Sequence, residues 1–251
     1  MLTQERQTLI KNYVEKHDIC RVSELCELTQ SSESTIRRDL SEMDQLGLLH
    51  RVHGGAQAIN PESDIAQHIR FTINVEQKRK IAEFAVKNFV KANSYIFLDA
   101  GTTIYEMVPF LKDIHNLTVV TNSLDTAVEL LKLDISTRLL GGKLKKATHA
   151  IIGETALVQL KELHFNASFI GANGLNKNGT FTTPDPAEAA IKKAEIIQAD
   201  SSYILMDSSK IATNNFASFA DVNEATLIID SLSTNQKEKL PQGLIYKEAN
   251  V

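Results

Sequence analysis

Cysteine, long apolar runs and surplus positive charge are scarce in this 251-residue chain, and each shortage weighs against a class of protein. The two cysteines, Cys20 and Cys26, form no CxxC pair, so we expect neither a disulfide framework nor a structural zinc site. No apolar run approaches the roughly 20 residues that cross a bilayer, and the polar start MLTQERQTLIKNYVEKHD is not a secretory signal. We therefore expect a cytoplasmic protein with reduced thiols, no bound metal and no membrane partner.

The charge balance argues mildly against a nucleic-acid-binding protein. The chain has 27 Lys and Arg against 31 Asp and Glu, a net charge of −4 at pH 7, and residues 1–56 hold seven basic against nine acidic residues. Any DNA contact must therefore come from local placement of charge. The length suits one large domain or two smaller ones, and 43% hydrophobic residues are ordinary for a globular protein.

The first part of the chain has the pattern of short helices followed by a hairpin. Apolar spacing predicts helices over residues 3–16, 22–28 and 32–45, with a tight turn at Thr29–Ser31. Ser31 or Ser32 is the candidate N-cap of the third helix, and Gly47 ends it. Residues 48–52, followed by Gly54 and Gly55, indicate a short hairpin.

The third helix separates an apolar face from a polar one. Ile36, Leu40 and Met43 form the expected buried face. The opposite face can lie in a DNA major groove, where short hydroxyl side chains allow close approach and arginines reach phosphates or guanine edges. A pair of arginines on a helix is, by itself, more often a solvated face. The DNA-contacting residues that we predict on this helix and on the hairpin are Ser32, Ser34, Thr35, Arg37, Arg38, Arg51 and His53.

The strings STIRRDL and LGLLHRVHGGA closely resemble the DNA-binding signature of the DeoR family of bacterial transcription regulators. The resemblance covers about residues 3–58. It implies a winged helix-turn-helix domain over residues 1–57, with its motif near residues 20–39. The residues alone support only a helical DNA-binding candidate.

A polar segment with Pro61 follows, and we expect a linker over residues 58–74. From residue 75 to 251, short apolar strands alternate with helices, which predicts a mostly parallel sheet covered on both faces. Ligands bind such sheets beyond the carboxyl ends of the strands. Strands are expected at 95–98, 117–120, 137–140, 167–170, 203–206 and 227–229, and helices at 80–89, 101–111, 123–133, 149–160 and 186–199.

Four strand ends carry residues suited to a small anionic ligand. The loop Asp99–Thr103 offers backbone N–H groups, two hydroxyls and a helix start to a phosphate, although glycine and threonine are also common turn chemistry. Thr121–Ser123 repeats this pattern, with a simple helix cap as the alternative. The 141–143 loop adds a lysine that could pair with phosphate or be merely solvated, and Asn173 could meet a sugar hydroxyl.

Charged residues further along complete the candidate site. Glu188 and Lys192 are four residues apart, so the alternative for them is a surface ion pair worth a few tenths of a kcal/mol. The predicted effector-binding residues are Asp99, Gly101, Thr102, Thr103, Thr121, Asn122, Ser123, Gly142, Lys143, Asn173, Gly174, Asp185, Glu188, Lys192 and Lys210.

These loops resemble the DeoR-family sensor domain over about residues 75–230, a fold similar to ribose-5-phosphate isomerase. The resemblance implies that the Asp99–Thr103 loop takes a phosphate and that Asn122, Asn173 and Lys210 approach the sugar. FLDAGTT, LLGGKLK and FTTPDPAEAA look closest to fructose-operon repressors, which implies fructose 1-phosphate as the effector and no cofactor.

We therefore predict a two-domain α/β protein: a transcription regulator that represses a sugar-utilisation operon, such as a fructose phosphotransferase operon, and leaves its operator DNA when a sugar phosphate binds. A homo-oligomer, dimer or tetramer, is expected. The alternatives are an activator, or a sugar-phosphate isomerase whose base would be Asp99, Asp185 or Glu188. No lysine- and glycine-rich catalytic loop supports the isomerase. The inducer stays open between fructose 1-phosphate, fructose 1,6-bisphosphate and a tagatose phosphate.

Overall fold

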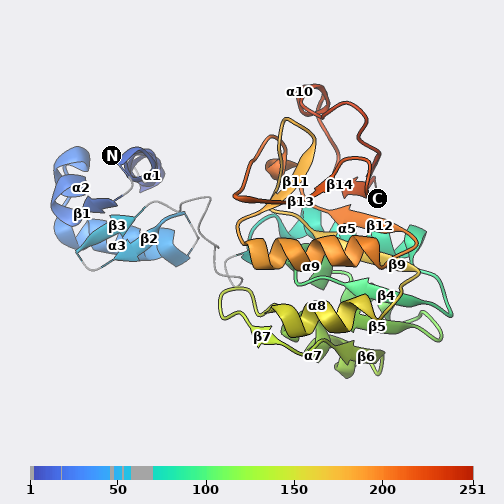
Figure 1. Ribbon diagram of the computed structural model, residues 1–251. Helices are drawn as coiled ribbons and strands as arrows, with labels where there is room; N and C mark the ends of the chain where they lie inside the picture. Colours follow the sequence, from blue (N-terminus) through green and yellow to red (C-terminus); the bar gives the residue numbers. More distant parts are fainter. Residues whose placement is uncertain (1–2, 18, 46–47, 53, 58–69, 251) are drawn as a thin grey trace. The chain divides into compact units, whose positions relative to one another are not determined.

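The computed structural model describes residues 3–17, 19–45, 48–52, 54–57 and 70–250 (Figure 1). Within them the chain forms two compact units, Met1–Ile73 and Asn74–Val251. His53, Gly47 and most of the predicted linker (residues 58–69) lie outside the described part. No helix of the described part is both long and apolar enough to cross a bilayer.

The N-terminal unit consists of three helices and a small antiparallel sheet with strand order β1-β3-β2 (Figure 1). The three predicted helices and the hairpin are confirmed, whereas β1 was not predicted because three residues show no alternation. The elements are α1 (Thr3–His17), β1 (Ile19–Arg21), α2 (Val22–Thr29), α3 (Glu33–Gln45), β2 (His50–Val52) and β3 (Gly55–Gln57).

Apolar side chains from all three helices form one core in this unit. Ile36, Leu40 and Met43 are fully buried, as their spacing predicts. Gly55 allows β3 to pair with β1, because a Cβ there would lie 2.0 Å from the carbonyl oxygen of Cys20. Cys20 and Cys26, both in the described part, form no disulfide.

The C-terminal unit is built on a seven-stranded parallel sheet with order β15-β14-β12-β9-β4-β5-β6. The predicted parallel sheet is confirmed, and β15 was not predicted. The strands are β4 (Tyr95–Leu98), β5 (Thr118–Thr121), β6 (Ser136–Leu139), β9 (Ala167–Gly171), β12 (Ser202–Leu205), β14 (Thr226–Ile229) and β15 (Tyr246–Glu248).

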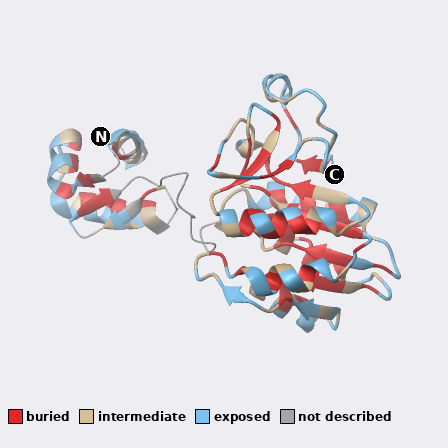
Figure 2. Cartoon of the chain, in the orientation of Figure 1, coloured by how far each residue is buried: buried red, intermediate tan, exposed pale blue. Residues whose placement is uncertain are grey.

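Helices cover both faces of this sheet, and β4, β5, β9 and β14 are buried along most of their length, whereas the edge strands β6 and β15 have no buried residue (Figure 2). Successive strand residues point to opposite faces, so Ile96 and Leu98 pack with α5 and α7, while Phe97 packs with α8 and α9. The helices are α5 (Val75–Phe89), α6 (Thr102–Tyr105), α7 (Leu124–Lys132), α8 (Glu154–Lys161), α9 (Pro186–Ile197) and α10 (Thr234–Glu238).

Two predicted helices are wrong in part. The helix predicted over 101–111 is split into α6 and the 3₁₀ helix η1 (Val108–Leu111), because Pro109 has no N–H and disfavours an α conformation before it. The helix predicted from residue 149 begins only at Glu154. Left-handed backbone at His149 (φ +48°) and Gly153 (φ +97°) interrupts it.

Smaller sheets stand beside the main one, and none of them was predicted. An antiparallel sheet has the order β10-β11-β13, and β7 pairs with β8. Strands of two residues are too short to give an alternating pattern. Their bounds are β7 (Lys143–Leu144), β8 (Ile151–Ile152), β10 (Gly174–Leu175), β11 (Thr180–Thr183) and β13 (Ala217–Asp221).

Candidate functional sites

The turn between α2 and α3 sets the direction of α3. Gln30 ends α2 in the left-handed region (φ 51°), where few residues other than glycine and asparagine are found. Two residues later, Ser32 accepts a hydrogen bond at Oγ from the Thr35 N–H (3.3 Å), so Ser32 caps α3. The helix therefore starts with its first turn presenting hydroxyls.

The outer face of α3 carries the predicted polar residues. Ser34, Arg37 and Arg38 are exposed and Thr35 is half-buried. Arg37 is paired with Glu33 one turn earlier (Nη2–Oε1 2.5 Å). Arg38, by contrast, makes no ion pair or hydrogen bond with any residue of the described part. The face can contact an anionic partner, and Arg38 is its most available cation.

The β2–β3 hairpin lies beside this face. The Arg51 N–H donates to Asp44 Oδ1 (3.1 Å) and its guanidinium donates to Ser41 Oγ (2.6 Å), so α3 holds the exposed Arg51 in place. His53 lies outside the described residues. A hollow of about 320 Å³ lies between α3 and the hairpin. It is lined by Val22, Arg37, Asp44, Arg51, Val52, Gly54 and Gly55.

A buried ion pair fixes α3 against α1. Arg6 Nε donates to Asp39 Oδ2 (2.5 Å) and Nη2 to Oδ1 (3.2 Å), and the Asp39 side chain is only 4% exposed. Sequence reasoning missed this pair. The charged residue that follows Arg38 therefore faces inward and supports the fold.

In the C-terminal unit, strands β12, β9, β4 and β5 are neighbours, so their carboxyl ends bring four of the predicted loops together. Asp99, directly after β4, joins the end of β9 to helix α9. Its Oδ2 accepts a hydrogen bond from the Gly171 N–H (2.9 Å) and from Lys192 Nζ (2.5 Å). Asp99 and Lys192 are both buried. Burial opposes the charge on Lys192, yet the carboxylate of Asp99 raises the lysine pKa above its ordinary value.

A second cluster of charged side chains lies at the start of α9. Lys145 Nζ contacts Asp185 Oδ2 (2.6 Å) and Glu188 Oε1 (3.1 Å), and Thr148 Oγ1 donates to the same Glu188 oxygen (2.8 Å). Burial would raise the pKa of Asp185, but hydrogen bonds from Lys145 and the Ala187 N–H lower it. The surface ion pair between Glu188 and Lys192 is therefore wrong: both are buried, and each has another partner.

The loop after β5 has two roles. Ser123 Oγ accepts from the Thr126 N–H (3.2 Å), which confirms the helix-cap alternative for this residue, and Thr121 Oγ1 donates to the Leu98 carbonyl (2.6 Å). Asn122 is 2% exposed, and its Oδ1 has no hydrogen-bond partner within the described part. A buried amide oxygen without a partner is uncommon in a folded protein, which makes Asn122 a candidate for a role in binding.

The loops after β9 and β12 also touch. Asn173 Oδ1 accepts from Thr183 Oγ1 (3.1 Å), and Lys210 Nζ donates to the Ala172 carbonyl (2.9 Å). A Cβ on Gly174 would lie 2.4 Å from the Thr213 carbonyl oxygen, so this close approach requires glycine. Asn173 and Lys210 thus share one edge with Asp99.

The remaining predicted residues differ in their placement. Thr102 and Thr103 are buried at the start of α6, whose single turn carries little of a helix dipole, and Gly101 precedes them. Gly142 and Lys143 are exposed beside and on β7, and neither contacts the other predicted residues of the described part.

Three residues of the site were not predicted. Lys145 and Thr148 come from the segment after Gly141-Gly142, where the run KLKKATH was the available signal. Glu195 is fully buried on α9 and belongs to the same face as Glu188 and Lys192, which the spacing 188-192-195 indicates. Among the described residues, no group of His, Cys, Asp and Glu is arranged to hold a metal.

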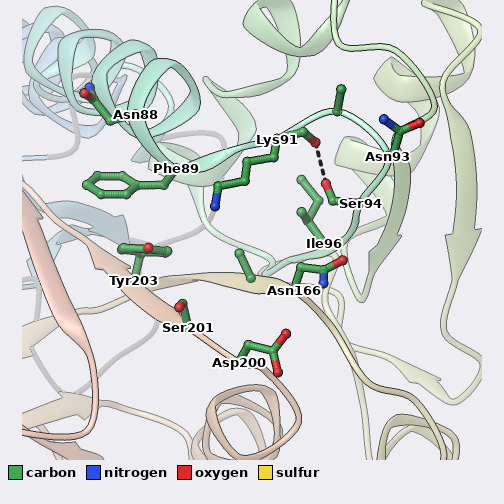
Figure 3. Close-up of a pocket in the computed structure, with 12 residues that line it drawn as sticks. Asn88, Phe89, Lys91, Asn93, Ser94, Ile96, Asn166, Asp200, Ser201 and Tyr203 are labelled. Carbon is green, nitrogen blue, oxygen red and sulfur yellow. Dashed lines mark hydrogen bonds between the residues drawn. The ribbon is translucent and has the colours of Figure 1, made fainter.

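A hollow of about 400 Å³ lies at the opposite edge, near the amino ends of β4, β9 and β12 (Figure 3). Phe89 and Tyr203 stack on one side of it (4.4 Å between ring centroids), and Lys91 and Asn166 contribute polar atoms. No predicted effector-binding residue lines it. At the carboxyl edge, the buried side chains Asp99, Lys192 and Glu188 form ion pairs within the protein.

Comparison with solved structures gives partial overlaps. Ribose 5-phosphate isomerase from Plasmodium falciparum overlaps with 53% of this chain and 51% of its own (TM-score 0.39, 18% identity). The isomerase a from Methanocaldococcus jannaschii overlaps with 55% and 54% (TM-score 0.41, 19% identity).

Comparison with sequences is more extensive. Residues 6–62 match the DeoR-like helix-turn-helix domain, and residues 73–231 match the DeoR C terminal sensor domain. An uncharacterized HTH-type transcriptional regulator FruR of Bacillus subtilis is 43% identical over 91% of both chains. The HTH-type transcriptional regulator GlpR of Haloferax volcanii is 33% identical over 96% of this chain and 95% of its own. A lactose phosphotransferase system repressor of Staphylococcus epidermidis is 32% identical over 94% and 95%. The chain therefore belongs to the DeoR family of transcriptional regulators.

Proposed function

We propose that this chain represses a sugar-utilisation operon, reads its operator through the outer face of α3 and the hairpin, and leaves DNA when a sugar phosphate binds the carboxyl edge of the sheet. Family membership makes the chain a regulator rather than a sugar-phosphate isomerase. A relative named as a lactose phosphotransferase system repressor supports both the repressor role and the sugar-transport setting. We further propose fructose 1-phosphate as the effector and a homo-oligomer as the DNA-binding form.

The observation that carries the proposal is that β4, β5, β9 and β12 are neighbouring parallel strands, so the loops after them lie at one edge of the sheet, where the buried pair Asp99–Lys192 also lies. Buried hydroxyls at Thr102 and Thr103 and the unpartnered Asn122 Oδ1 offer donors and an acceptor to a small polar ligand. A sugar phosphate has matching hydroxyls and oxygens. This chemistry favours an anionic sugar over an apolar ligand.

The mechanism needs a difference in affinity. A sugar phosphate that bound the DNA-competent and DNA-incompetent forms equally would shift nothing, so it must bind the incompetent form more tightly. A coupling free energy of about 1–3 kcal/mol changes operator affinity roughly 5- to 150-fold. The sensor unit therefore has to prefer one arrangement when its carboxyl edge is filled.

Fluorescence anisotropy tests the proposal directly. The full chain is titrated onto labelled DNA from upstream of its own gene, at fixed salt because phosphate contacts make affinity salt-dependent. A scrambled duplex of equal composition is the control. Fructose 1-phosphate, fructose 1,6-bisphosphate, tagatose 6-phosphate and unphosphorylated fructose are then added to the bound complex.

We expect specific binding that fructose 1-phosphate releases and unphosphorylated fructose does not. Release by another sugar phosphate would keep the mechanism and replace the effector. If the chain binds this DNA no tighter than the scrambled duplex, both alone and with each sugar phosphate, the proposal that it recognises an operator here is contradicted. Tight binding that no sugar phosphate weakens would contradict the sensor site.

A further inference from the structure

Glu195 is a carboxyl group that neither the fold nor the proposed contacts explain. Its side chain is fully buried on α9, one turn after Lys192. Neither carboxyl oxygen has a hydrogen-bond partner within the described part. Burying an unpaired carboxylate is costly, so a group in this position calls for a reason.

Three charged side chains lie close enough to Glu195 to interact with it electrostatically. Asp99 approaches from the end of β4, and Lys192 and Glu188 share its helix. Helix α9 also packs against α8, β8, β9, β11 and β13. Strands β8, β9 and β11 carry no charged residue. The charged residues on α8 and β13 are exposed: Glu154, Lys161 and Asp221.

One lysine cannot neutralise two carboxylates in this space. Lys192 bonds to Asp99 at 2.5 Å, and Glu188 already has Lys145 and Thr148. Burial, followed by the negative charge of Asp99, raises the pKa of Glu195 well above its ordinary value, and Lys192 only partly opposes this. Geometry and charge therefore agree on a neutral Glu195.

We propose that Glu195 is a positioning residue of the effector site: its protonated carboxyl leaves Lys192 to Asp99, and its ionisation would compete for Lys192 and place a further negative charge beneath the ligand loops. This inference rests on the proposed function, since it concerns the same sugar-phosphate site. It adds a dependence on pH that the loop residues alone do not provide. Effector affinity then depends on whether the buried carboxyl group of Glu195 carries a proton.

The direction of the pH effect follows from the charges. An anionic ligand favours the neutral form of a nearby carboxyl, so bound effector and the Glu195 proton stabilise each other. Affinity is therefore highest below the pH at which Glu195 ionises and falls as the pH rises through it. Glutamine at this position keeps the neutral shape and removes the titration.

Calorimetric titration of fructose 1-phosphate into the full chain tests the inference. The wild type, Glu195→Gln and the exposed control Glu162→Gln are compared over a pH series that begins at about pH 7, above the second phosphate pKa of about 6, and rises to the alkaline limit at which the chain stays folded. We expect wild type and Glu162→Gln to lose at least about fivefold in affinity as the pH rises through the ionisation of Glu195. Glu195→Gln should change much less, and its unfolding curve should show that it is folded.

Coincident pH profiles for wild type and Glu195→Gln would overturn the inference. If the wild type binds no fructose 1-phosphate at any pH, that effector is wrong, and Glu195 is then judged in the ligand-free chain. Carbon-13 NMR of labelled glutamate carboxyls identifies Glu195 as the signal missing from Glu195→Gln. A signal that titrates near the ordinary glutamate pKa of about 4.3 would overturn the inference independently of the effector.

Discussion

Arg37 and Arg38 are neighbours on the outer face of α3, yet they differ in what they contact. Arg37 is held by Glu33 at 2.5 Å, whereas Arg38 has no partner within the described residues. An exposed pair of this kind contributes little to stability, but it occupies the guanidinium that would otherwise meet DNA. Between the two arginines, loss of the Arg38 side chain should therefore lower DNA affinity more.

Arg38→Ala is expected to weaken operator binding by about 1–3 kcal/mol, the usual value of an arginine that contacts a guanine edge. Effector binding should be unchanged, since Arg38 belongs to the other compact unit. Thr102→Ala should do the reverse. Anisotropy on operator DNA and calorimetry with fructose 1-phosphate measure the two effects.

Lys16→Ala is the matched control for Arg38→Ala, because it also removes one exposed positive charge, from α1. It should lower operator affinity much less. If Arg38→Ala abolished effector binding in a folded chain, or bound operator as tightly as Lys16→Ala does, the assignment of Arg38 would be wrong.

The kinds of residue at the strand ends could be predicted from the sequence, but their partners could not. Asp99 was a candidate because it follows a buried strand, and its ion pair is with Lys192, 93 positions later. Local spacing placed Lys192 beside Glu188 instead, because a helix shows only its own i and i+4 neighbours. Long-range pairing depends on strand order, which periodicity does not reveal.

At the scale of elements, the predictions succeeded where a pattern is long. Helix α3 shows about two turns of apolar spacing from Ile36 to Met43, and this buried face is as predicted. The β10-β11-β13 sheet was missed because β10 has only two residues and β11 pairs with β13, which lies far from it in sequence. Helix starts were missed where the backbone turns left-handed, as at Gly153.

The Arg6–Asp39 pair joins α1 to α3 and should stabilise the orientation of α3. Asp39→Asn removes the negative charge from a nearly buried site while keeping its size. We expect the free energy of unfolding of the N-terminal unit to fall by about 1.5–3 kcal/mol, the range for hydrogen bonds to charged groups. Hydrogen exchange followed by mass spectrometry should show that peptides from α1 and α3 exchange faster in Asp39→Asn than in the wild type.

Glu42→Gln provides the comparison on the same helix. Glu42 accepts an exposed hydrogen bond from Gln7 (3.1 Å), and exposed contacts contribute little. Its exchange should resemble that of the wild type. Equal exchange in Asp39→Asn and Glu42→Gln would show that the buried pair does not hold α3.

At the scale of the whole molecule, the two compact units have separate cores. One core is formed by residues from Ile10 to Ala56, and three clusters lie between Ile81 and Ala249. Each unit buries its own apolar side chains, which is the property expected of parts that fold alone. A chain of residues 70–251 should therefore fold and bind fructose 1-phosphate as the whole chain does.

Because the two compact units have separate cores, the coupling between effector binding and DNA binding can be measured with and without the N-terminal unit. If fructose 1-phosphate lowers operator affinity by some factor, operator DNA must lower fructose 1-phosphate affinity by the same factor, about 5- to 150-fold for a typical coupling. Calorimetry with and without operator DNA should show this loss for the full chain and none for residues 70–251, which lack α3. A fragment that folds but does not bind fructose 1-phosphate, while the full chain binds it, would mean that the N-terminal unit supplies part of the site. Operator DNA that leaves the fructose 1-phosphate affinity of the full chain unchanged would mean that the two sites are not coupled.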